Sequence, residues 1–478
     1  MMIRLNILLI STYELGRQPF GLASPAAWLR RAGFQVECVD LSRNPLDQAV
    51  LRHAGFIAFY VPMHTATRLA INALPGVLRI NPKAHICFYG LYAPPNESYL
   101  RKQGVQTVLG GEFEEELVQA VSRMAASGAY GRIATGLASR AKRFPDQLGD
   151  QPSPVISLSR LNFLVPDRRG LPALSRYARL EQPGGKPRVT GYTEGSRGCK
   201  HLCRHCPVVP VYQGRFRIVQ PEIVLEDIRR QVAAGAEHIT FGDPDFFNGV
   251  RHAVSLMTSL HREHPALTYD VTIKVEHLLK HAQFLPTLRD TGCAFVTTAA
   301  ESFDDLILAR LEKGHTRADF LRALQLFRKT GLALAPTFVA FTPWTTLESY
   351  CDFLDTIARL DLVESVAPVQ LCIRLLIPGG SRLLELEEVR ARVDPFNEAG
   401  LMYPWRHKNP RVDQLFEEVH AVVQKGLSKD QSRCGVFEDV RAATQRAAGK
   451  TGPMPWPADM PPRISRAAIP YLTEPWYC

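Results

Sequence analysis

Cysteine spacing is the feature of this sequence that points most directly to chemistry. The segment GSRGCKHLCRHCPV, residues 195–208, places three residues between Cys199 and Cys203 and two between Cys203 and Cys206. Thiolates are preferred ligands of soft metals and of iron–sulfur clusters. Three thiolates on one loop can hold three corners of a [4Fe–4S] cubane, which leaves the fourth iron open to bind a substrate. The spacing therefore predicts a metal centre at these three cysteines.

A zinc site is the alternative for the same loop. Structural zinc takes four ligands, and His201 or His205 lies close enough in the sequence to supply the fourth. The remaining cysteines are scattered, at positions 38, 87, 293, 351, 372, 434 and 478. Such scattering in a chain of 478 residues argues against a disulfide scaffold. One tight group of thiols in a cytosolic chain favours metal binding.

Length and composition describe the molecule that must position this loop. A chain of 478 residues suggests two or three domains at roughly 150 residues each. No stretch reaches the roughly 18 apolar residues of a membrane helix. The N-terminal LNILLI is short and is followed by polar residues, so it reads as a first strand rather than a signal peptide. We expect a cytoplasmic protein that has no membrane partner.

The chain is basic overall. It carries 57 lysines and arginines against 47 acidic residues, a net charge of +10. A basic surface can favour RNA, a membrane surface or an anionic small molecule. The charge is spread along the chain without a Lys/Arg block, which is typical of a solvated surface. We therefore expect no nucleic-acid partner.

Apolar runs alternate with amphipathic stretches in residues 1–125. Five runs read as buried strands separated by helical crossovers, at residues 5–10, 34–40, 56–61, 85–90 and 106–110. Buried parallel strands have this near-continuous apolar pattern. The pattern predicts an α/β domain with a doubly wound, Rossmann-like sheet. Residues 126–188 lose the alternation and are rich in Gly, Pro, Ser and basic residues, which indicates a linker.

The alternation returns in residues 189–377, now with longer helices. Six strand candidates, from VTGYTEGS to VAPVQLCIRLLI, have helical stretches between them. Six β/α units predict a partial (β/α)6 barrel or an open curved parallel sheet, with the chemistry at the carboxyl ends of the strands. Residues 378–478 combine a helical stretch, VDQLFEEVHAVVQKGL, with a proline-rich, aromatic tail. We expect a C-terminal extension of helical and irregular structure there.

The C-x-x-x-C-x-x-C loop after the first barrel strand resembles that of the radical SAM superfamily. The resemblance covers roughly residues 190–377 and implies an enzyme that binds a [4Fe–4S] cluster and reductively cleaves S-adenosylmethionine (SAM). It also implies a small-molecule substrate and an electron donor such as flavodoxin or ferredoxin. In the family the residue before the third cysteine is usually aromatic and contacts the adenine. Here that residue is His205, which can still stack.

The same resemblance suggests SAM contacts at the strand ends. The FGDPDFFN segment matches a region that binds the SAM amino group, although its acids could equally cap a turn. The fourth strand ends at Glu301, followed downstream by Lys313 and His315, which could instead be a solvated helix end. The sixth strand carries Gln370 and an arginine that could bind the SAM carboxylate or pair with a buried acid. The SAM-contact candidates are His205, Gly242, Asp243, Asp245, Glu301, Ser302 and Arg374.

A small doubly wound domain ahead of such a barrel resembles the cobalamin-dependent class of the superfamily. The D-x-H-x-x-G signature, whose histidine ligates cobalt, is absent from the loop STYELGRQPFGLASP after the first strand. Several relatives share this absence, so the resemblance still implies cobalamin, bound without that histidine. Loop positions that could contact the corrin, although each could also be structural, are Tyr13, Gln18, Val61, His64, Gly90 and Gly110.

The segment TEPWYC resembles the tails of radical SAM proteins named for a Cys-Cys-Ala-Glu-Pro or Cys-selenocysteine-Ala-Glu-Pro motif. A selenocysteine could then follow Cys478, although an ordinary terminal cysteine fits the same letters. Cys434 and Cys478 are candidate catalytic thiols because soft thiolates bind soft elements.

Several functions are compatible with these resemblances. The first is modification of a small molecule, with cobalamin-dependent methylation as the reaction. The second is transfer of the 3-amino-3-carboxypropyl group of SAM to trivalent arsenic, as in the radical SAM enzyme of arsinothricin biosynthesis. The third is tRNA modification, and the fourth is a non-catalytic sensor that binds a metal or a corrin.

Overall fold

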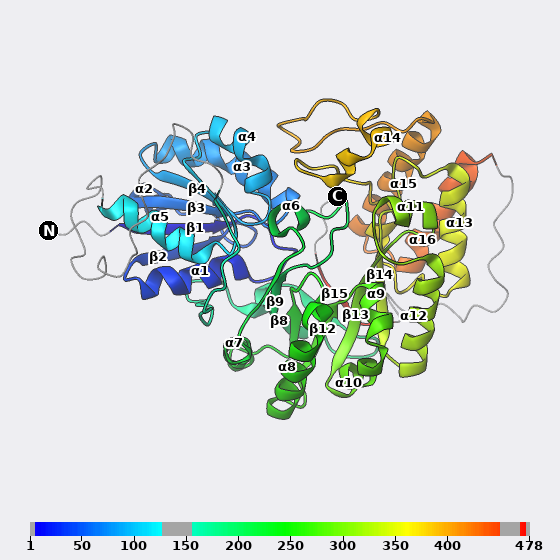
Figure 1. Ribbon diagram of the computed structural model, residues 1–478, viewed down its shortest axis with the longest axis horizontal. Coiled ribbons are helices and arrows are strands. Elements are labelled where there is room, and N and C mark those ends of the chain that lie inside the picture. The colour runs from blue at the N-terminus through cyan, green and yellow to red at the C-terminus, as the bar shows by residue number, and fades with distance from the viewer. Residues whose placement is uncertain (1–4, 127–154, 450–468, 475–478) are drawn as a thin grey trace. The chain divides into compact units, whose positions relative to one another are not determined.

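The computed structural model describes residues 5–126, 155–449 and 469–474 (Figure 1). The chain divides into two compact units. The first contains the residues up to Arg176 with two short returns, 210–212 and 398–401, and the second contains the other residues. Among the described residues, no helix is both long enough and apolar enough to cross a membrane.

The first unit is built on one parallel sheet. Its strand order is β2-β1-β3-β4-β5-β6, with every neighbouring pair parallel. The strands are β1 Asn6–Ser11, β2 Gln35–Asp40, β3 Ala54–Tyr60, β4 His85–Tyr89, β5 Thr107–Gly111 and β6 Val155–Ser157. The first five match the predicted runs, and β6 lies inside the stretch expected to be a linker.

Helices cover both faces of this sheet, as the doubly wound prediction requires. One face packs against α1 Phe20–Arg31 and α5 Glu114–Ala126, and its core includes Leu9 and Cys87. The other face packs against α2 Gln48–His53, α3 His64–Ile80 and α4 Glu97–Lys102, and its core includes Leu8 and Ile57. Successive strand residues point to opposite faces, so a strand buried on both sides is apolar at every position. The predicted α/β class is therefore confirmed.

The second unit holds a curled sheet of seven strands in the order β14-β13-β12-β11-β8-β7-β15 (Figure 1). Five of them run parallel: β8 Arg188–Thr193, β11 His238–Phe241, β12 Thr268–Thr272, β13 Cys293–Glu301 and β14 Ala333–Phe338. The last two strands of the order, β7 Arg179–Glu181 and β15 Tyr471–Leu472, are antiparallel to their neighbours. This is the half-barrel that the sequence predicts, extended at its first strand.

Crossover helices connect the parallel strands, and their ends follow local sequence signals. The principal helices are α7 Pro221–Ala233, α8 Val250–Glu263, α9 Val275–Lys280, α10 Leu285–Asp290, α11 Asp305–Arg310, α12 Arg317–Thr330 and α13 Leu347–Arg359. Helix α12 begins with a capping box between Thr316 and Asp319 and ends at Gly331, whose φ is +75°. These short connections bring the carboxyl ends of the strands to one edge of the sheet.

The sixth predicted strand does not form. Pro368–Leu371 is a 3-10 helix (η5) instead, and a single bridge joins Phe341 to Arg374. Pro368 lacks the N–H that a ladder needs, which accounts for the turn in an apolar run. The C-terminal extension then forms α14 Glu387–Arg390, α15 Pro410–Ser428 and α16 Arg433–Ala447, as the helical pattern indicates.

Candidate functional site

The cysteine loop follows β8 at the carboxyl edge of the curled sheet. A short strand, β9 Ser196–Gly198, leads into it and pairs with β10 Phe216–Ile218. Asp243, just after β11, fixes this approach because its carboxylate accepts from the Gly195 N–H at 2.9 Å and from the Ser196 hydroxyl at 2.6 Å. The neighbouring strand end therefore determines where the loop begins.

The three thiols lie in a largely buried environment. Cys199 and Cys203 are 9% and 6% exposed, and Cys206 is half-buried. Burial raises the pKa of Cys199 and raises the pKa of Cys206 to about 12. The metal-free thiols of Cys199 and Cys206 are therefore protonated at neutral pH, and metal binding must release their protons. Three closely spaced sulfur donors on one loop fit a cluster that has an open iron.

A buried carboxylate connects this loop to the end of β13. Glu301 Oε1 lies 3.1 Å from His205 Nε2 and 3.0 Å from Lys313 Nζ. Burial alone would raise the pKa of Glu301, but the charges of Lys313 and His205 lower it well below its usual range. Burial would likewise lower the pKa of Lys313, but the Glu301 carboxylate raises it. Two charged groups thus stay ionised at the carboxyl edge of the sheet.

Cations also lie next to the thiols. Lys274, at the end of β12, places Nζ 3.8 Å from Cys203 Sγ and 3.7 Å from Glu276 Oε2. His315 is uncharged at neutral pH because burial lowers its pKa to about 4, and its Nε2–H donates to the Ala300 carbonyl at 3.3 Å. Sequence reasoning did not identify Lys274. Its position directly after a barrel strand was the signal that could have found it.

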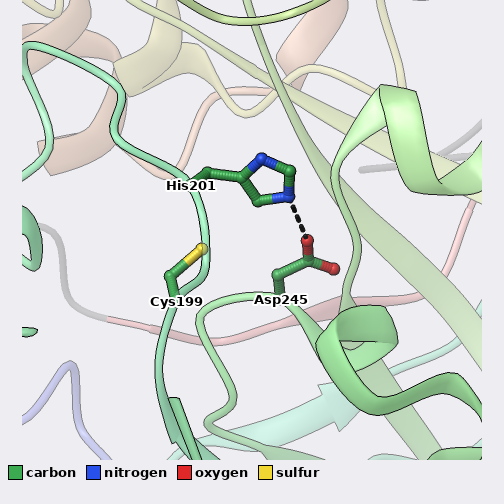
Figure 2. Close-up of side chains that lie close together, drawn as sticks. All are labelled: Cys199, His201 and Asp245. Atoms are coloured by element: carbon green, nitrogen blue, oxygen red, sulfur yellow. Dashed lines mark ion pairs between the residues drawn. The ribbon is translucent and has the colours of Figure 1, made fainter. Parts of the chain in front are cut away.

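The region after β11 holds two predicted residues. Gly242 admits no side chain, because an added Cβ would lie 1.7 Å from Tyr192 Oη. Asp245 caps the short helix that follows by accepting from the Phe247 N–H at 3.2 Å. Figure 2 shows the side chains of Cys199, His201 and Asp245 pointing toward one another. Asp245 therefore lies beside the loop and Gly242 lies against Tyr192 of β8, and SAM binding by either residue stays a prediction.

The remaining barrel candidates have structural partners. The Ser302 hydroxyl accepts from the Asp304 N–H at 3.0 Å, and Gln370 accepts from the Phe338 N–H at 2.9 Å. Arg374 pairs with Asp413 at 2.8 Å and lies over the Trp405 ring, 3.8 Å from its centroid. Of the two roles considered for this arginine, the structure places it in the pairing role.

A cavity of about 230 Å³ lies where β13 and β14 end. Its lining includes Glu301, Ser302, Arg317, Thr345 and Tyr350. Glu301 therefore borders this cavity, while its buried carboxylate pairs with Lys313 and His205. The mixture of charged, hydroxyl and aromatic groups suits a polar organic ligand.

The six predicted corrin contacts lie at the carboxyl edge of the parallel sheet in the first unit. Tyr13, Gln18 and Val61 are buried there, and Gln18 donates to the Pro172 carbonyl at 2.8 Å. His64 begins α3, and burial lowers its pKa. Two glycines remove side-chain bulk from the same edge, at Gly90, where φ is +115°, and at Gly110, where a Cβ would lie 2.3 Å from Pro94. Ligands of doubly wound sheets bind at this edge.

Of the two predicted catalytic thiols, Cys434 is buried within α16, at 7% exposure. Cys478 lies outside the described residues.

Comparison with known proteins adds three findings. Residues 193–360 match the family model described as the Radical SAM superfamily. A tRNA-2-methylthio-N(6)-dimethylallyladenosine synthase from Desulfosudis oleivorans is 31% identical over 37% of this chain and 38% of its own length. The match therefore spans well under half of that curated relative. Part of the chain, and not the whole, resembles the synthase.

Solved structures share the fold over much more of the chain. The cobalamin-dependent SAM radical enzyme OxsB aligns with 89% of this chain and 67% of its own, at a TM-score of 0.67 and 13% identity. The radical SAM methyltransferase TsrM from Kitasatospora setae aligns with 75% of this chain and 71% of its own, at a TM-score of 0.57 and 19% identity. At these identities the likeness concerns the fold alone.

The pH dependence of stability tests the buried Asp243. Burial raises its pKa to about 7, so the folded protein holds this proton more tightly than the unfolded chain. Its contribution to the free energy of unfolding is present below pH ~4 and is lost as the pH rises through 7. The loss between pH 5 and 8 should be about 2–3 kcal/mol. Urea unfolding of the metal-free protein at several pH values should show this loss of unfolding free energy in the wild type and not in the Asp243→Asn variant. If the unfolding free energies of the two proteins change with pH in parallel, the prediction is wrong.

Replacing the loop cysteines tests the metal centre. Ala at Cys199, Cys203 or Cys206 should remove most bound iron and the broad visible absorbance of a reconstituted cluster, since each thiol supplies one ligand. Cys351→Ala, at a thiol that is also buried, is the matched control and should keep both. Iron that survives the loop substitutions would mean that the ligands are elsewhere.

Proposed function

Because residues 193–360 form a radical SAM domain, preceded by a sheet with the fold of a B12-type domain, we propose that this protein is a cobalamin-dependent methyltransferase acting on a small molecule. The observation that carries the proposal is the cysteine loop, joined through His205 and Glu301 to the end of β13. The radical SAM domain implies a [4Fe–4S] cluster and SAM as its cofactors. Cys199, Cys203 and Cys206 are the cluster ligands in this proposal.

The cofactors have distinct chemical tasks. The cluster, when bound, supplies an electron that breaks a C–S bond of the SAM sulfonium, and cobalamin, when bound, carries a methyl group. The electron comes from a reductant of the flavodoxin or ferredoxin class. The protein's own task is to bind and orient SAM beside the loop and to hold the corrin at the carboxyl edge of the first unit's sheet.

Glu301 is the residue we assign to SAM. Its carboxylate stays ionised because Lys313 lies 3.0 Å away, so it can accept from the ribose hydroxyls or the ammonium group. The His205 Nε2–H donates to the same carboxylate at 3.1 Å, which fixes the ring plane on which adenine can stack. The cavity beside Glu301 gives polar groups of a ligand access to this edge.

The corrin site lacks a D-x-H-x-x-G histidine, so the lower face of cobalt has no ligand from that motif. Gly90 and Gly110 let Tyr60 and Pro94 pack against the strand ends, and Tyr13, Gln18, Val61 and His64 lie on the same carboxyl edge. The proposal places the corrin against this edge. A cobalamin-binding assay with the cluster-free protein would test the corrin site independently of the cluster.

RNA modification is a second candidate because the curated relative named above is a tRNA-modifying synthase, matched over 37% of this chain. The net charge of +10 is compatible with RNA. Filter binding with tRNA across a salt series distinguishes the candidates: an RNA enzyme should bind with a steep salt dependence. If the protein does not bind tRNA at low salt, RNA modification is excluded as its function.

Products of SAM identify the reaction. Anaerobically reconstituted protein, given reductant, cobalamin and SAM, should release 5′-deoxyadenosine and S-adenosylhomocysteine, which mass spectrometry separates. Methylthioadenosine would contradict methylation and indicate transfer of the aminocarboxypropyl group, with arsenite the first acceptor to add. Intact SAM beside a verified reduced cluster would favour a sensor.

Substitution of Glu301 tests its assignment. Glu301→Gln keeps the shape but removes the charge, so the Kd for SAM should rise at least tenfold, about 1.4 kcal/mol, while iron content stays unchanged. Glu263→Gln, in a surface pair with Arg229, is the control and should leave both values unaltered. Equal SAM affinity in the two variants would exclude Glu301 from the SAM site.

A further inference from the structure

Three side chains from separate segments meet behind the cysteine loop. His201 comes from the loop itself, Asp245 follows β11, and His277 lies in α9. Asp245 is 0% exposed and His277 is 1% exposed, while His201 is 14% exposed. Figure 2 shows that the His201 ring and the Asp245 carboxylate face each other, with Cys199 beside them. The group is therefore buried, polar and assembled by the tertiary fold.

The facing atoms of these side chains are short of hydrogen bonds. Asp245 Oδ2 lies 2.6 Å from His277 Nδ1 and 3.6 Å from His201 Nε2. None of the three atoms makes a hydrogen bond of good geometry within the described structure, although all are buried. Buried polar atoms without such bonds are rare and commonly mark a bound water or ion. Here both imidazole nitrogens face Asp245 Oδ2, which identifies the side of the carboxylate that an ion would occupy.

The chemistry of the donors selects a class of ion. Two imidazole nitrogens and one carboxylate oxygen suit zinc, ferrous iron and similar divalent transition metals. The carboxylate is ionised: burial would raise the pKa of Asp245, but the two imidazoles lower it to about 2. Glu276 Oε2 lies 3.7 Å from His201 Nδ1, on the far side of the ring. A carboxylate behind a ligating histidine is a common arrangement in metal sites.

The spacing is compatible with a metal ion. Ligand bonds of about 2.0–2.2 Å place tetrahedral donor atoms roughly 3.3–3.5 Å apart. The separation of His201 and Asp245 already lies near this range, and His277 has to move back by less than about 1 Å. Cys199 Sγ lies within 4.8 Å of the His201 and Asp245 donors, but it is assigned to the cluster. His277 supplies the third ligand in its place.

We propose that His201, Asp245 and His277 bind one divalent transition-metal ion of the zinc or ferrous class, in addition to the cluster held by the three cysteines. The ion ties the cysteine loop to the end of β11 and to α9, so it fixes the loop from behind. The site does not require the cysteines, which separates it from a zinc site made by the loop alone.

Cobalt(II) is the probe, because its absorption reports its ligands. The full chain with Cys199, Cys203 and Cys206 all replaced by Ala should bind one Co²⁺, without the near-ultraviolet band of sulfur ligation. Adding His277→Gln or the nearly isosteric Asp245→Asn should weaken binding at least tenfold. Adding His281→Gln instead should leave Co²⁺ binding unchanged, although the centroids of the His281 and His277 rings are only 5.8 Å apart. Circular dichroism verifies that each variant is folded.

The result that overturns the proposal is a folded triple variant that binds no Co²⁺, in which case the trio is a hydrogen-bonded cluster only. Loss of Co²⁺ in the His281 variant would overturn the ligand assignment. In reconstituted wild-type protein, elemental analysis after exposure to Zn²⁺ should find one zinc besides the cluster iron. Protein that contains cluster iron but no zinc would contradict the second metal site and leave the proposed cluster intact. Protein that contains zinc but no iron would contradict the proposed cluster and leave the second metal site intact.

Discussion

One buried carboxylate holds the candidate site together. Glu301 ends β13 with a φ of +63°, a left-handed conformation that costs a residue with a side chain about 1–3 kcal/mol. Burying its charge would be more costly still without partners. Lys313 and His205 supply them, at 3.0 Å and 3.1 Å. Since His205 belongs to the cysteine loop, this compensation joins the loop to the sheet.

The electrostatics of the loop depend on that arrangement. Buried thiols with raised pKa values resist ionisation, so the bare loop favours neutral sulfur. Lys274 and Lys313 bring positive charge to the same region, which favours an anionic cluster once the protons leave. Asp243 and Asp245 hold the loop from the β11 side. Residues far apart in the sequence thus give the site a charge distribution that favours a negatively charged metal group.

Sequence reasoning succeeded where a pattern is local. Strands buried on both faces read as apolar runs, so five strands of the first unit and most of the barrel were predictable. The cysteine loop could be recognised as a candidate metal centre because its three thiols lie within eight residues. The prediction of a sixth barrel strand was wrong, since Pro368–Leu371 form a 3-10 helix. The three-residue β6 is too short and too isolated for its pattern to be recognised.

The features that the sequence did not predict depend on contacts between residues far apart in the chain. Arg374 pairs with Asp413 and lies over Trp405, 39 and 31 positions later, contacts that no local pattern indicates, and its role as a SAM ligand stays a prediction. The His201, Asp245 and His277 group is invisible in sequence because its members span more than seventy positions. Each residue alone reads as a loop polar group or a helix cap. Only the fold brings them to one point.

The most direct test of the central claim uses electron paramagnetic resonance of the reduced, reconstituted protein. If three cysteines hold the cluster and its fourth iron is open, adding SAM should shift the spectrum, because SAM then binds that iron. Glu301→Gln should need at least tenfold more SAM for the same shift. A spectrum that SAM leaves unchanged at saturating concentration would contradict the open-iron site and the account that depends on it.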